Sequence, residues 1–401
     1  MYPGLGGRLL HRWPLLWLSA AKIYTLPKKG VVWEGGDAQF KADPESRETG
    51  LIPLKPKLEK KEKTMKSKRI FGIVAIFVVL GLAAGLTAPP EATSKPIGIV
   101  FSTYWPTSYE HSWLPIVHFA EEVEKQSGGR VKFQLYHTAQ LYTGKEEFAA
   151  VERGDIDMSA PLDLYNMGIV PELGISNLPF MWGRPRTLQK TLDAGLWDLG
   201  INDKLLKHNM VVLGVGAGGP YQFYAKDFEV RTPQDLKGKK WGVSGSTACK
   251  FIELLGGAPT TMSSGELYLA LQRGTIDGCT RPFITGIGRK LYEVVGNLSV
   301  TNMAYYCSFL IINKKKWDSL PNDVQEIMKK AAKKRDHEMM EMVEVFIDEA
   351  VRLFEQKGVK VHIATPEEKA QFKKAGEPVY DWWLKKVPDG KKYIEFSRTH
   401  Q

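Results

Sequence analysis

The sequence predicts an α/β protein built from two similar lobes. Three observations lead to this fold class: a strand–helix–strand pattern near residue 100, a short internal repeat, and a long helical stretch near the C-terminus. The chain has 401 residues, which is long enough for two domains of roughly 100–200 residues each. Its 43% hydrophobic and 25% charged residues are typical of a globular protein and exclude a disordered or fibrous one.

The net charge of +10 is concentrated at the N-terminus. Residues 1–94 carry 15 Lys and Arg against 8 Asp and Glu, whereas the remaining 307 residues carry 40 against 37. A strongly basic protein would suggest nucleic acid or an anionic membrane as the partner. Because the body has a net charge of only +3, we expect no nucleic-acid partner.

The N-terminal segment has the parts of a secretory signal. The uncharged run 70–88 follows Lys66, Lys68 and Arg69, and small residues come after it, at 92–94. We therefore expect a signal peptide over residues 65–94 and export to the periplasm. Residues 1–64 then have no natural place, and we interpret them as an extension from a mis-called start. The alternative is an uncleaved anchor, because a run of this length just spans a bilayer.

The body begins with one βαβ unit. Residues 97–101 and 131–136 have the composition of strands, and residues 109–126 between them carry apolar side chains at helical spacing. Gly128 and Gly129 follow the helix, where a left-handed residue commonly ends one. Such units indicate a mostly parallel sheet.

A weak internal repeat indicates a second lobe. Residues 146–157 resemble residues 266–277, and each copy reads as a helix, a glycine stop and the start of a strand. Helix–glycine–strand junctions can also converge on similar residues without a common fold. If the repeat is real, two α/β lobes face each other across a cleft, which is a favoured place for a small ligand.

The C-terminal part predicts two helices. Residues 321–356 contain no Gly or Pro after the first position and would form a helix of roughly 50 Å. This length exceeds one lobe, so the helix either bridges both lobes or is kinked into two. Thr365 and Pro366 then predict an N-cap, starting a final helix to about residue 386.

The sequence shows no cofactor or metal motif. The glycine-rich residues 214–219 follow a strand, but a dinucleotide site needs a helix next, and residues 220–228 alternate like a strand instead. We therefore interpret the glycines as a crossing between lobes. His111 and His118 lie on one predicted helix without a third ligand nearby. No cofactor and no metal are expected.

The three cysteines leave two questions open. Cys249 would support an enzyme only if it were reactive and lined the cleft, and no local residue indicates that. Cys279 and Cys307 can pair in an oxidising compartment, but the sequence gives no geometry for them.

Two groups of residues suggest ligand binding. Tyr104, Trp105 and Tyr109 crowd the loop after the first strand, and Arg281 follows a predicted strand at 276–279. A guanidinium at a strand end can bind both oxygens of a carboxylate. A lone arginine is otherwise a surface charge or part of an internal salt bridge.

Several ordered motifs resemble the DctP-type solute-binding proteins of TRAP transporters. The resemblance covers the chain from about residue 97 to the C-terminus. Its main motifs are the segments 232–240 (TPQDLKGKK), 257–262 (GAPTTM) and 265–278 (GELYLALQRGTIDG), with shorter matches at 140–141, 152–158 and 312–321.

This resemblance implies a two-lobed periplasmic-binding-protein fold with cross-over strands and a long helix spanning both lobes. It implies that the protein is not an enzyme but a monomeric subunit that captures a small organic acid, in the first place a monocarboxylate. The subunit is expected to deliver this acid to an ion-gradient-driven permease. Lobe I is expected at 95–219 plus 307–346 and lobe II at 220–306 plus 347–401, with hinges near 216–219 and 305–309. The rival interpretation is a membrane-anchored sensory or scaffold protein with an uncleaved N-terminal helix.

The chain departs from the family where the ligand is expected. Gly242 stands at the position of the usual carboxylate-binding arginine, and Gln222 at that of a second arginine found in some members. Arg281 stands where the family usually has asparagine, so we hypothesise that it supplies the missing charge. Gly242 would leave room for the ligand, with Trp241, Tyr104 and Trp105 as walls. The expected ligand-binding residues are Arg281, Trp241, Gln222, Tyr104, Trp105, Tyr165 and Asp163.

Overall fold

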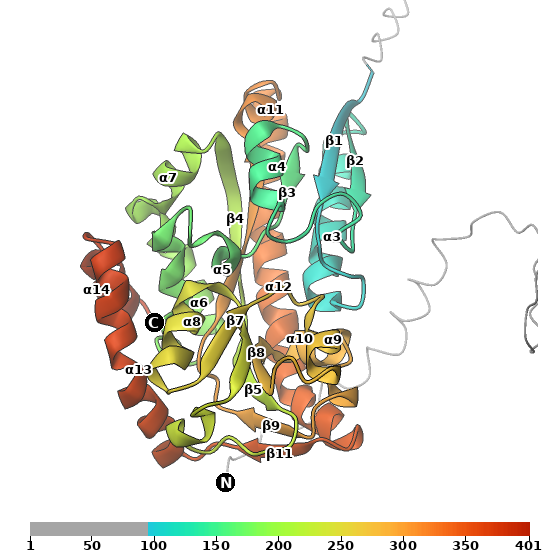
Figure 1. Cartoon of the computed structure of the whole chain (residues 1–401). Helices are drawn as coiled ribbons and strands as arrows, with labels where there is room; N and C mark the ends of the chain where they lie inside the picture. Colours follow the sequence, from blue (N-terminus) through green and yellow to red (C-terminus); the bar gives the residue numbers. More distant parts are fainter. Residues whose placement is uncertain (1–94) are drawn as a thin grey trace, which may run out of the picture. The chain divides into compact units, whose positions relative to one another are not determined.

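The computed structural model describes residues 95–401 (Figure 1). The expected signal peptide, the possible membrane anchor and the upstream extension all lie outside the described residues. The described residues belong to one compact unit. No helix among residues 95–401 is long and apolar enough to cross a membrane.

The first sheet has five strands and forms the centre of lobe I. Its order is β2-β1-β3-β10-β4. Strand β1 runs parallel to β2 and β3, whereas β10 runs antiparallel to β3 and β4. The predicted βαβ unit is therefore present, with helix α3 (Glu110–Gln126) between its two strands. The strands are β1 (Ile97–Ser102), β2 (Val131–Tyr136), β3 (Met158–Ser159), β4 (Met210–Gly218) and β10 (Tyr306–Asn313).

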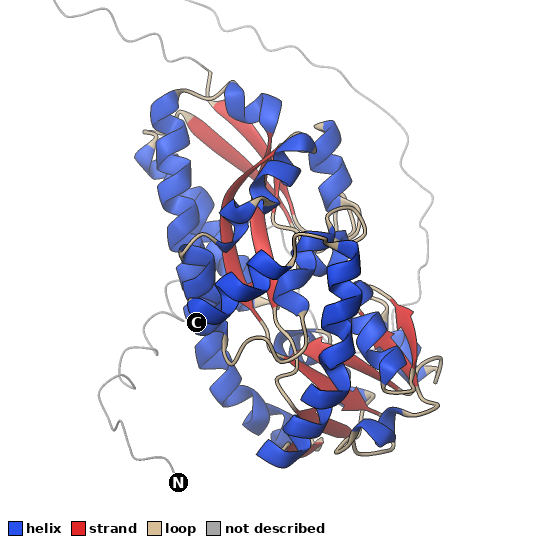
Figure 2. Cartoon of the chain, turned by 90° about the vertical axis from the view of Figure 1, so that its left-hand side faces the viewer, coloured by secondary structure: helices blue, strands red, loops and turns tan. Residues whose placement is uncertain are grey.

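The second sheet has six strands and forms the centre of lobe II. Its order is β11-β9-β5-β8-β6-β7, again with parallel and antiparallel pairs. Figure 2 shows the strands of both sheets between helices. The strands are β5 (Tyr221–Ala225), β6 (Lys240–Val243), β7 (Ala258–Thr261), β8 (Gly278–Pro282), β9 (Asn297–Val300) and β11 (Lys360–Ile363).

The chain crosses between the sheets along extended strands. Strand β4 ends the first sheet at Gly218, and β5 begins the second at Tyr221, so the glycine-rich run is a crossing as predicted. The return crossing leads from β9 to β10. The two-lobed α/β fold with cross-over strands is thus confirmed, while the expected residue limits of the lobes remain a prediction.

The internal repeat corresponds to a repeated local structure. Helices α4 (Glu147–Arg153) and α9 (Leu267–Gln272) are followed by glycines with φ of 79° and 69°. Just before the next strand, Asp157 accepts a hydrogen bond from the backbone N–H of Val100 at 2.8 Å, and Asp277 accepts one from Lys240 at 2.7 Å. These matching contacts support a doubled lobe over chance convergence.

The long helix α12 (Asn322–Gln356) is continuous, so the kinked alternative is wrong. It contacts α3, α6 and β4 in lobe I and β11 and α10 in lobe II. It therefore spans both lobes. Near its middle, the buried Arg335 bonds the side chain of Asp336 at 2.8 Å and the carbonyl of Ser308 in β10 at 3.0 Å.

The C-terminus contains one more helix than predicted. Helix α13 (Pro366–Lys386) begins with the expected N-cap, where Thr365 and Glu368 form a reciprocal capping box. A further helix, α14 (Lys391–Thr399), follows and packs against lobe I. The remaining helices are α5 (Asp163–Asn166), α6 (Pro185–Asp193), α7 (Ile201–Lys207), α8 (Gly245–Leu254), α10 (Phe283–Gly288) and α11 (Lys314–Asp318).

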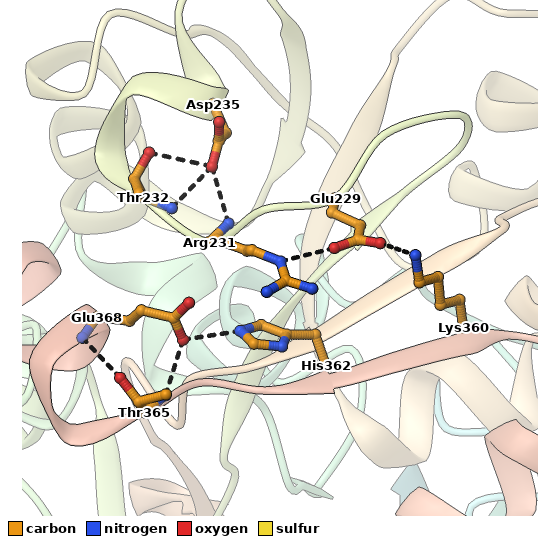
Figure 3. A network of polar contacts seen from close by, with 8 residues as sticks. All are labelled: Glu229, Arg231, Thr232, Asp235, Lys360, His362, Thr365 and Glu368. Carbon is orange, nitrogen blue, oxygen red and sulfur yellow. Dashed lines mark hydrogen bonds and ion pairs between the residues drawn. The ribbon is translucent and has the colours of Figure 1, made fainter.

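A network of ion pairs joins the loop after β5 to β11 and to the start of α13 (Figure 3). Glu229 bonds Arg231 at 2.7 Å and pairs with Lys360, and these two cations lower the pKa of Glu229 to about 2. His362 bonds Glu368 at 2.7 Å. The Glu229 pairs lie at the surface and each contribute little to stability, whereas the His362–Glu368 pair is partly buried and joins β11 to the start of α13.

Cys279 and Cys307 do not pair. Both are free and fully buried, in two different hydrophobic clusters. The Cys307 thiol instead lies 3.2 Å from the hydroxyl of Ser176. The described structure therefore lacks the disulfide between Cys279 and Cys307 that the sequence had left undecided.

Removing the carboxylate of Asp336 should destabilise the protein strongly. In Asp336→Ala, the buried Arg335 loses its charge partner, and breaking such a pair typically costs about 3–5 kcal/mol. Asp318→Ala is the matched control, because Asp318 pairs with Lys314 on the surface and its loss should cost under about 1 kcal/mol. Urea unfolding measures both, and equal losses would contradict the assignment.

Candidate ligand-binding site

A small cavity lies between the two lobes. The cavity has a volume of about 10 Å³, which is room for about one water molecule. From lobe I the cavity is lined by Tyr104, Trp105, Tyr109, Ser112, Leu162, Tyr165 and Tyr306; from lobe II by Tyr221, Ser264, Arg281, Pro282, Ile284 and Thr285. A cavity with both lobes as walls is the position expected for the ligand of a two-lobed binding protein.

Arg281 supplies the positive charge of this cavity. It lies on β8, and its side chain is only 2% exposed. Its terminal nitrogens donate to the carbonyls of Met262 at 2.8 Å and Thr280 at 2.6 Å, with longer contacts to Gly242 at 3.2 Å and Val243 at 3.4 Å. The Nε–H has no partner. Among residues 95–401, no carboxylate pairs with this guanidinium, so the internal salt bridge considered from the sequence is not present.

Tyrosine hydroxyls form much of the remaining wall. Burial raises the pKa of Tyr104 and of Tyr221 well above the usual value, and for Tyr221 the Arg281 charge partly opposes this effect. The tyrosines therefore stay neutral and can both donate and accept hydrogen bonds. The hydroxyl of Ser264, also in the cavity wall, has no partner. The cavity thus offers one cation and several neutral hydroxyls.

The structure brings four of the seven predicted site residues to the cavity. These are Tyr104, Trp105, Tyr165 and Arg281. Tyr165 is held by a T-shaped contact with Tyr104, their ring centroids 5.8 Å apart. Tyr165 also borders a larger groove of about 440 Å³ that both lobes line, so its ring lies between the enclosed cavity and the groove.

Trp241 lies in the core and does not line the cavity. It is fully buried, and its ring packs edge-on against Phe223 at 5.5 Å between centroids. The expected room at Gly242 is also not available to a ligand. A Cβ there would lie 2.8 Å from Ile276 and 3.0 Å from Leu267, so apolar side chains fill the space. The idea that Gly242 enlarges the site is therefore wrong.

The side chain of Gln222 forms hydrogen bonds with the backbone of the protein and does not line the cavity. Its carbonyl oxygen accepts from the backbone N–H groups of Thr301 at 2.8 Å and Asn302 at 2.9 Å. These contacts tie β5 to the return crossing between the lobes. Gln222 therefore supports the crossing rather than offering a free polar group to a ligand.

Asp163 also does not line the cavity and is fully bonded to the protein. Its carboxylate accepts from the backbone N–H groups of Leu164 at 2.7 Å and Cys307 at 2.8 Å, and from the side chain of Asn177 at 3.0 Å. Leu164 and Cys307 are the chain neighbours of two cavity tyrosines. Burial raises the pKa of Asp163 to about 7 despite these donors.

Sequence reasoning missed several lining residues. Tyr221 begins the aromatic strand after the glycine-rich crossing, and Tyr306 lies in an expected hinge. Tyr109 was noted with the aromatic loop after the first strand but was not among the seven expected ligand-binding residues. All three lie next to a segment that the sequence had indicated, either a crossing between the lobes or the first aromatic loop. Their position beside these segments could have identified them as lining residues. Ser112, Ser264 and Thr285 carried no such signal.

The other candidate chemistry is not supported by its surroundings. Cys249 lines the larger groove, but burial raises its pKa, whereas an activated thiol has a lowered one. Burial lowers the pKa of His111 to about 3, and His118 bonds Glu338 at 2.6 Å. Within residues 95–401, no three His, Cys, Asp or Glu side chains are grouped as metal ligands.

Comparison with known proteins places this geometry in one class. Residues 101–386 match the family model described as bacterial extracellular solute-binding protein, family 7, DctP. The C4-dicarboxylate-binding periplasmic protein DctP of Rhodobacter capsulatus is 27% identical over 80% of this chain and 96% of its own length.

Solved structures agree with this match. A TRAP periplasmic solute-binding protein from Chromohalobacter salexigens, with bound D-glucuronate, is 25% identical and covers 76% of this chain and all of its own, with a TM-score of 0.71. A second one from Ralstonia eutropha H16, with bound (S)-2-acetolactate, is 26% identical over 75% of this chain and 99% of its own, with a TM-score of 0.70.

The fold is that of the solute-binding subunits of TRAP transporters, which are not enzymes. The family model covers well over half of the chain. The chain therefore belongs to the DctP family of TRAP-transporter solute-binding proteins.

Asp163 should make the stability of this protein depend on pH. Its folded pKa of about 7 lies above the unfolded value near 3.9. Its stabilising contribution is therefore complete below about pH 4 and is lost as the pH rises through 7. At about 1.4 kcal/mol per unit, Asp163→Asn should gain up to about 4 kcal/mol relative to the wild type between pH 4 and 8.

Chemical unfolding at a series of pH values measures this difference. Asp227→Asn is the control, because Asp227 is exposed and its substitution should leave the pH profile unchanged. Parallel profiles for the wild type and Asp163→Asn would show that Asp163 does not titrate in this range.

Proposed function

We propose that the protein is the periplasmic subunit of a TRAP transporter that captures a small monocarboxylate between its lobes and delivers it to a membrane permease. The observation that carries this proposal is the buried Arg281 guanidinium without a carboxylate partner. A buried charge is costly unless it is compensated. The backbone carbonyls around Arg281 compensate it in part, and a ligand carboxylate would supply the missing negative charge.

The bonding of Arg281 indicates how the carboxylate is held. Two of its contacts, to Met262 and Thr280, are short, and the other two, to Gly242 and Val243, are long. The Nε–H is the one donor left without a partner. We infer that the carboxylate binds on the Nε side and that nearby hydroxyls such as Ser264 complete its hydrogen bonds.

The cavity lining favours one carboxylate over two. Arg281 is the single cation among the described residues that line it, and the other polar groups are neutral hydroxyls. A second carboxylate would be desolvated without a counter-charge, whereas hydroxyl or keto groups would find partners. Trp105, Leu162 and Ile284 add an apolar surface. The acids held by the Chromohalobacter and Ralstonia proteins, D-glucuronate and (S)-2-acetolactate, each carry a single carboxylate with polar substituents.

The enclosed cavity implies that the lobes move. Room for about one water molecule does not admit an organic acid, so binding requires the lobes to separate and close again. The two crossings between β4 and β5 and between β9 and β10 are the expected hinges, close to the hinge regions predicted from the sequence. The closed form would then be the surface that the permease recognises.

The proposed location follows from the family and the N-terminus. The Rhodobacter relative is a periplasmic protein by name, and residues 65–94 have the pattern of a cleavable signal. Determining the N-terminus of the exported protein separates this location from the membrane-anchored alternative. Recovery of the uncharged run 70–88 in the membrane fraction would favour the anchored protein.

Replacing Arg281 should weaken ligand binding strongly. Losing a charge-assisted, desolvated contact typically costs about 1.5–3 kcal/mol, so Arg281→Ala should raise the dissociation constant about 10- to 150-fold. Titration calorimetry with the best-binding acid measures this. Arg281→Lys keeps the charge and tests whether loss of the carbonyl contacts alone is responsible. Arg273→Ala, at an exposed arginine of lobe II, is the control; an affinity within twofold of wild type for Arg281→Ala would refute the clamp.

A thermal-shift screen should identify the ligand class. A ligand at a hundred times its dissociation constant adds about 2.7 kcal/mol to stability, which raises the melting temperature by several degrees. We expect hydroxy- and keto-monocarboxylates to stabilise the protein more than dicarboxylates of the same length or the corresponding amides. Stabilisation by neutral osmolytes alone would mean that Arg281 does not define the ligand.

A further inference from the structure

The two lobes touch directly beside the cavity, through Tyr109. This residue is the N-cap of α3 in lobe I and is 3% exposed. Its hydroxyl donates a hydrogen bond to the hydroxyl of Thr285 in α10 of lobe II, at 3.2 Å. The neighbouring Ser108 hydroxyl donates to the carbonyl of Gly288, at the end of the same helix, at 3.3 Å. Two adjacent residues of lobe I therefore form hydrogen bonds with the same short helix of lobe II, α10.

The ring of Tyr109 makes two further contacts with lobe II. The guanidinium of Arg289 lies 5.5 Å from the ring centroid, which is within the range of a cation–π interaction. A Cβ at Gly288 would lie 2.6 Å from the ring, so no larger residue fits there while the lobes are together. The backbone of Gly288 is not left-handed. Its lack of a side chain is therefore required by the approach of Tyr109 and not by the conformation of α10.

We propose that Tyr109 is a latch that holds the lobes closed over the ligand cavity. The proposal rests on the lobe closure proposed above. Tyr109 and Thr285 both line the cavity, and their hydroxyls bond each other across it. Closing the latch therefore completes the wall around the ligand. Opening it removes the hydrogen bond, the cation–π contact and the ring packing together, so the latch biases the equilibrium between open and closed forms.

The latch differs from ordinary packing because its two sides lie on different lobes. Neither Tyr109 nor Gly288 needs the other for the fold of its own lobe: Tyr109 precedes α3, and Gly288 ends α10. A change at Gly288 can thus act on closure without disturbing lobe II. Alanine is a better helix former than glycine, so Gly288→Ala should leave lobe II intact and exclude the Tyr109 ring.

The test is a double-mutant cycle of Gly288→Ala and Tyr109→Ala in the full chain. Nitroxide labels are attached to the cysteines of Glu121→Cys and Gln272→Cys, two exposed positions on different lobes. The distance between the labels, and hence the lobe separation, is measured by double electron–electron resonance. The background carries Cys249→Ser, since Cys249 is the partly exposed native thiol. Spectra are recorded without ligand and with D-glucuronate or (S)-2-acetolactate. Gly265→Ala is the control, because its Cβ would have no neighbour closer than 3.9 Å.

We expect Gly288→Ala to lengthen the distance between the labels and to reduce the closed fraction relative to the open one about tenfold or more. In the Tyr109→Ala background, adding Gly288→Ala should change nothing, because the ring that it excludes is gone. An unchanged distance in Gly288→Ala, or the same lengthening in both backgrounds, would overturn the latch. A wild type that is open under all conditions would overturn the lobe closure itself, which distinguishes the two failures.

Discussion

The proposed site depends on one buried charge that no carboxylate among residues 95–401 neutralises. The guanidinium of Arg281 is held by carbonyls from the end of β6, from the loop after β7 and from β8 itself. It therefore joins neighbouring segments of lobe II and brings a cation to the cavity. Carbonyl dipoles compensate such a charge only in part. An acidic side chain in the wall would neutralise it and abolish an anion site, and the polar groups of the observed wall are hydroxyls. The composition of the cavity is therefore compatible with the proposed anion site.

The fold could be predicted well because its signals are local. Helix ends are marked by Gly128, Gly154 and Gly274, and the capping box at Thr365 by residues that bond within one turn. The repeat was visible because both copies use the same local contacts, down to the aspartate that bonds the backbone of a neighbouring strand. Helix α14 was missed because it is short and follows a proline–aspartate–glycine turn. The sequence did not decide whether α12 is one continuous helix or is kinked into two, because the length of a helical stretch alone does not distinguish these cases.

The site could be predicted only in part, because it depends on which face of a strand meets the cleft. When both faces of a strand are buried, the sequence does not alternate between polar and apolar residues. Trp241 and Gly242 are an example: Trp241 packs on Phe223, and the space beside Gly242 is filled by apolar side chains. Gln222 and Asp163 are buried polar residues that resemble ligand contacts, yet their partners are backbone N–H groups at the crossings. Such partners lie far away in the sequence and carry no local signal.

If Arg281 supplies the charge that the family resemblance places at position 242, as hypothesised, the way in which the ligand is held changes. An Arg281 nitrogen lies 3.2 Å from the Gly242 carbonyl, so the positive charge stays beside the strand where the family usually places its arginine. A guanidinium whose fork is free can offer two nitrogens to a carboxylate. In the described structure, the terminal nitrogens of Arg281 instead make four contacts with backbone carbonyls, and only its Nε–H is without a partner. It can attract a carboxylate but can fix its orientation only weakly. In the proposed complex, the tyrosine, serine and threonine hydroxyls that line the cavity would therefore determine which acid fits. One of them, that of Tyr109, bonds the other lobe.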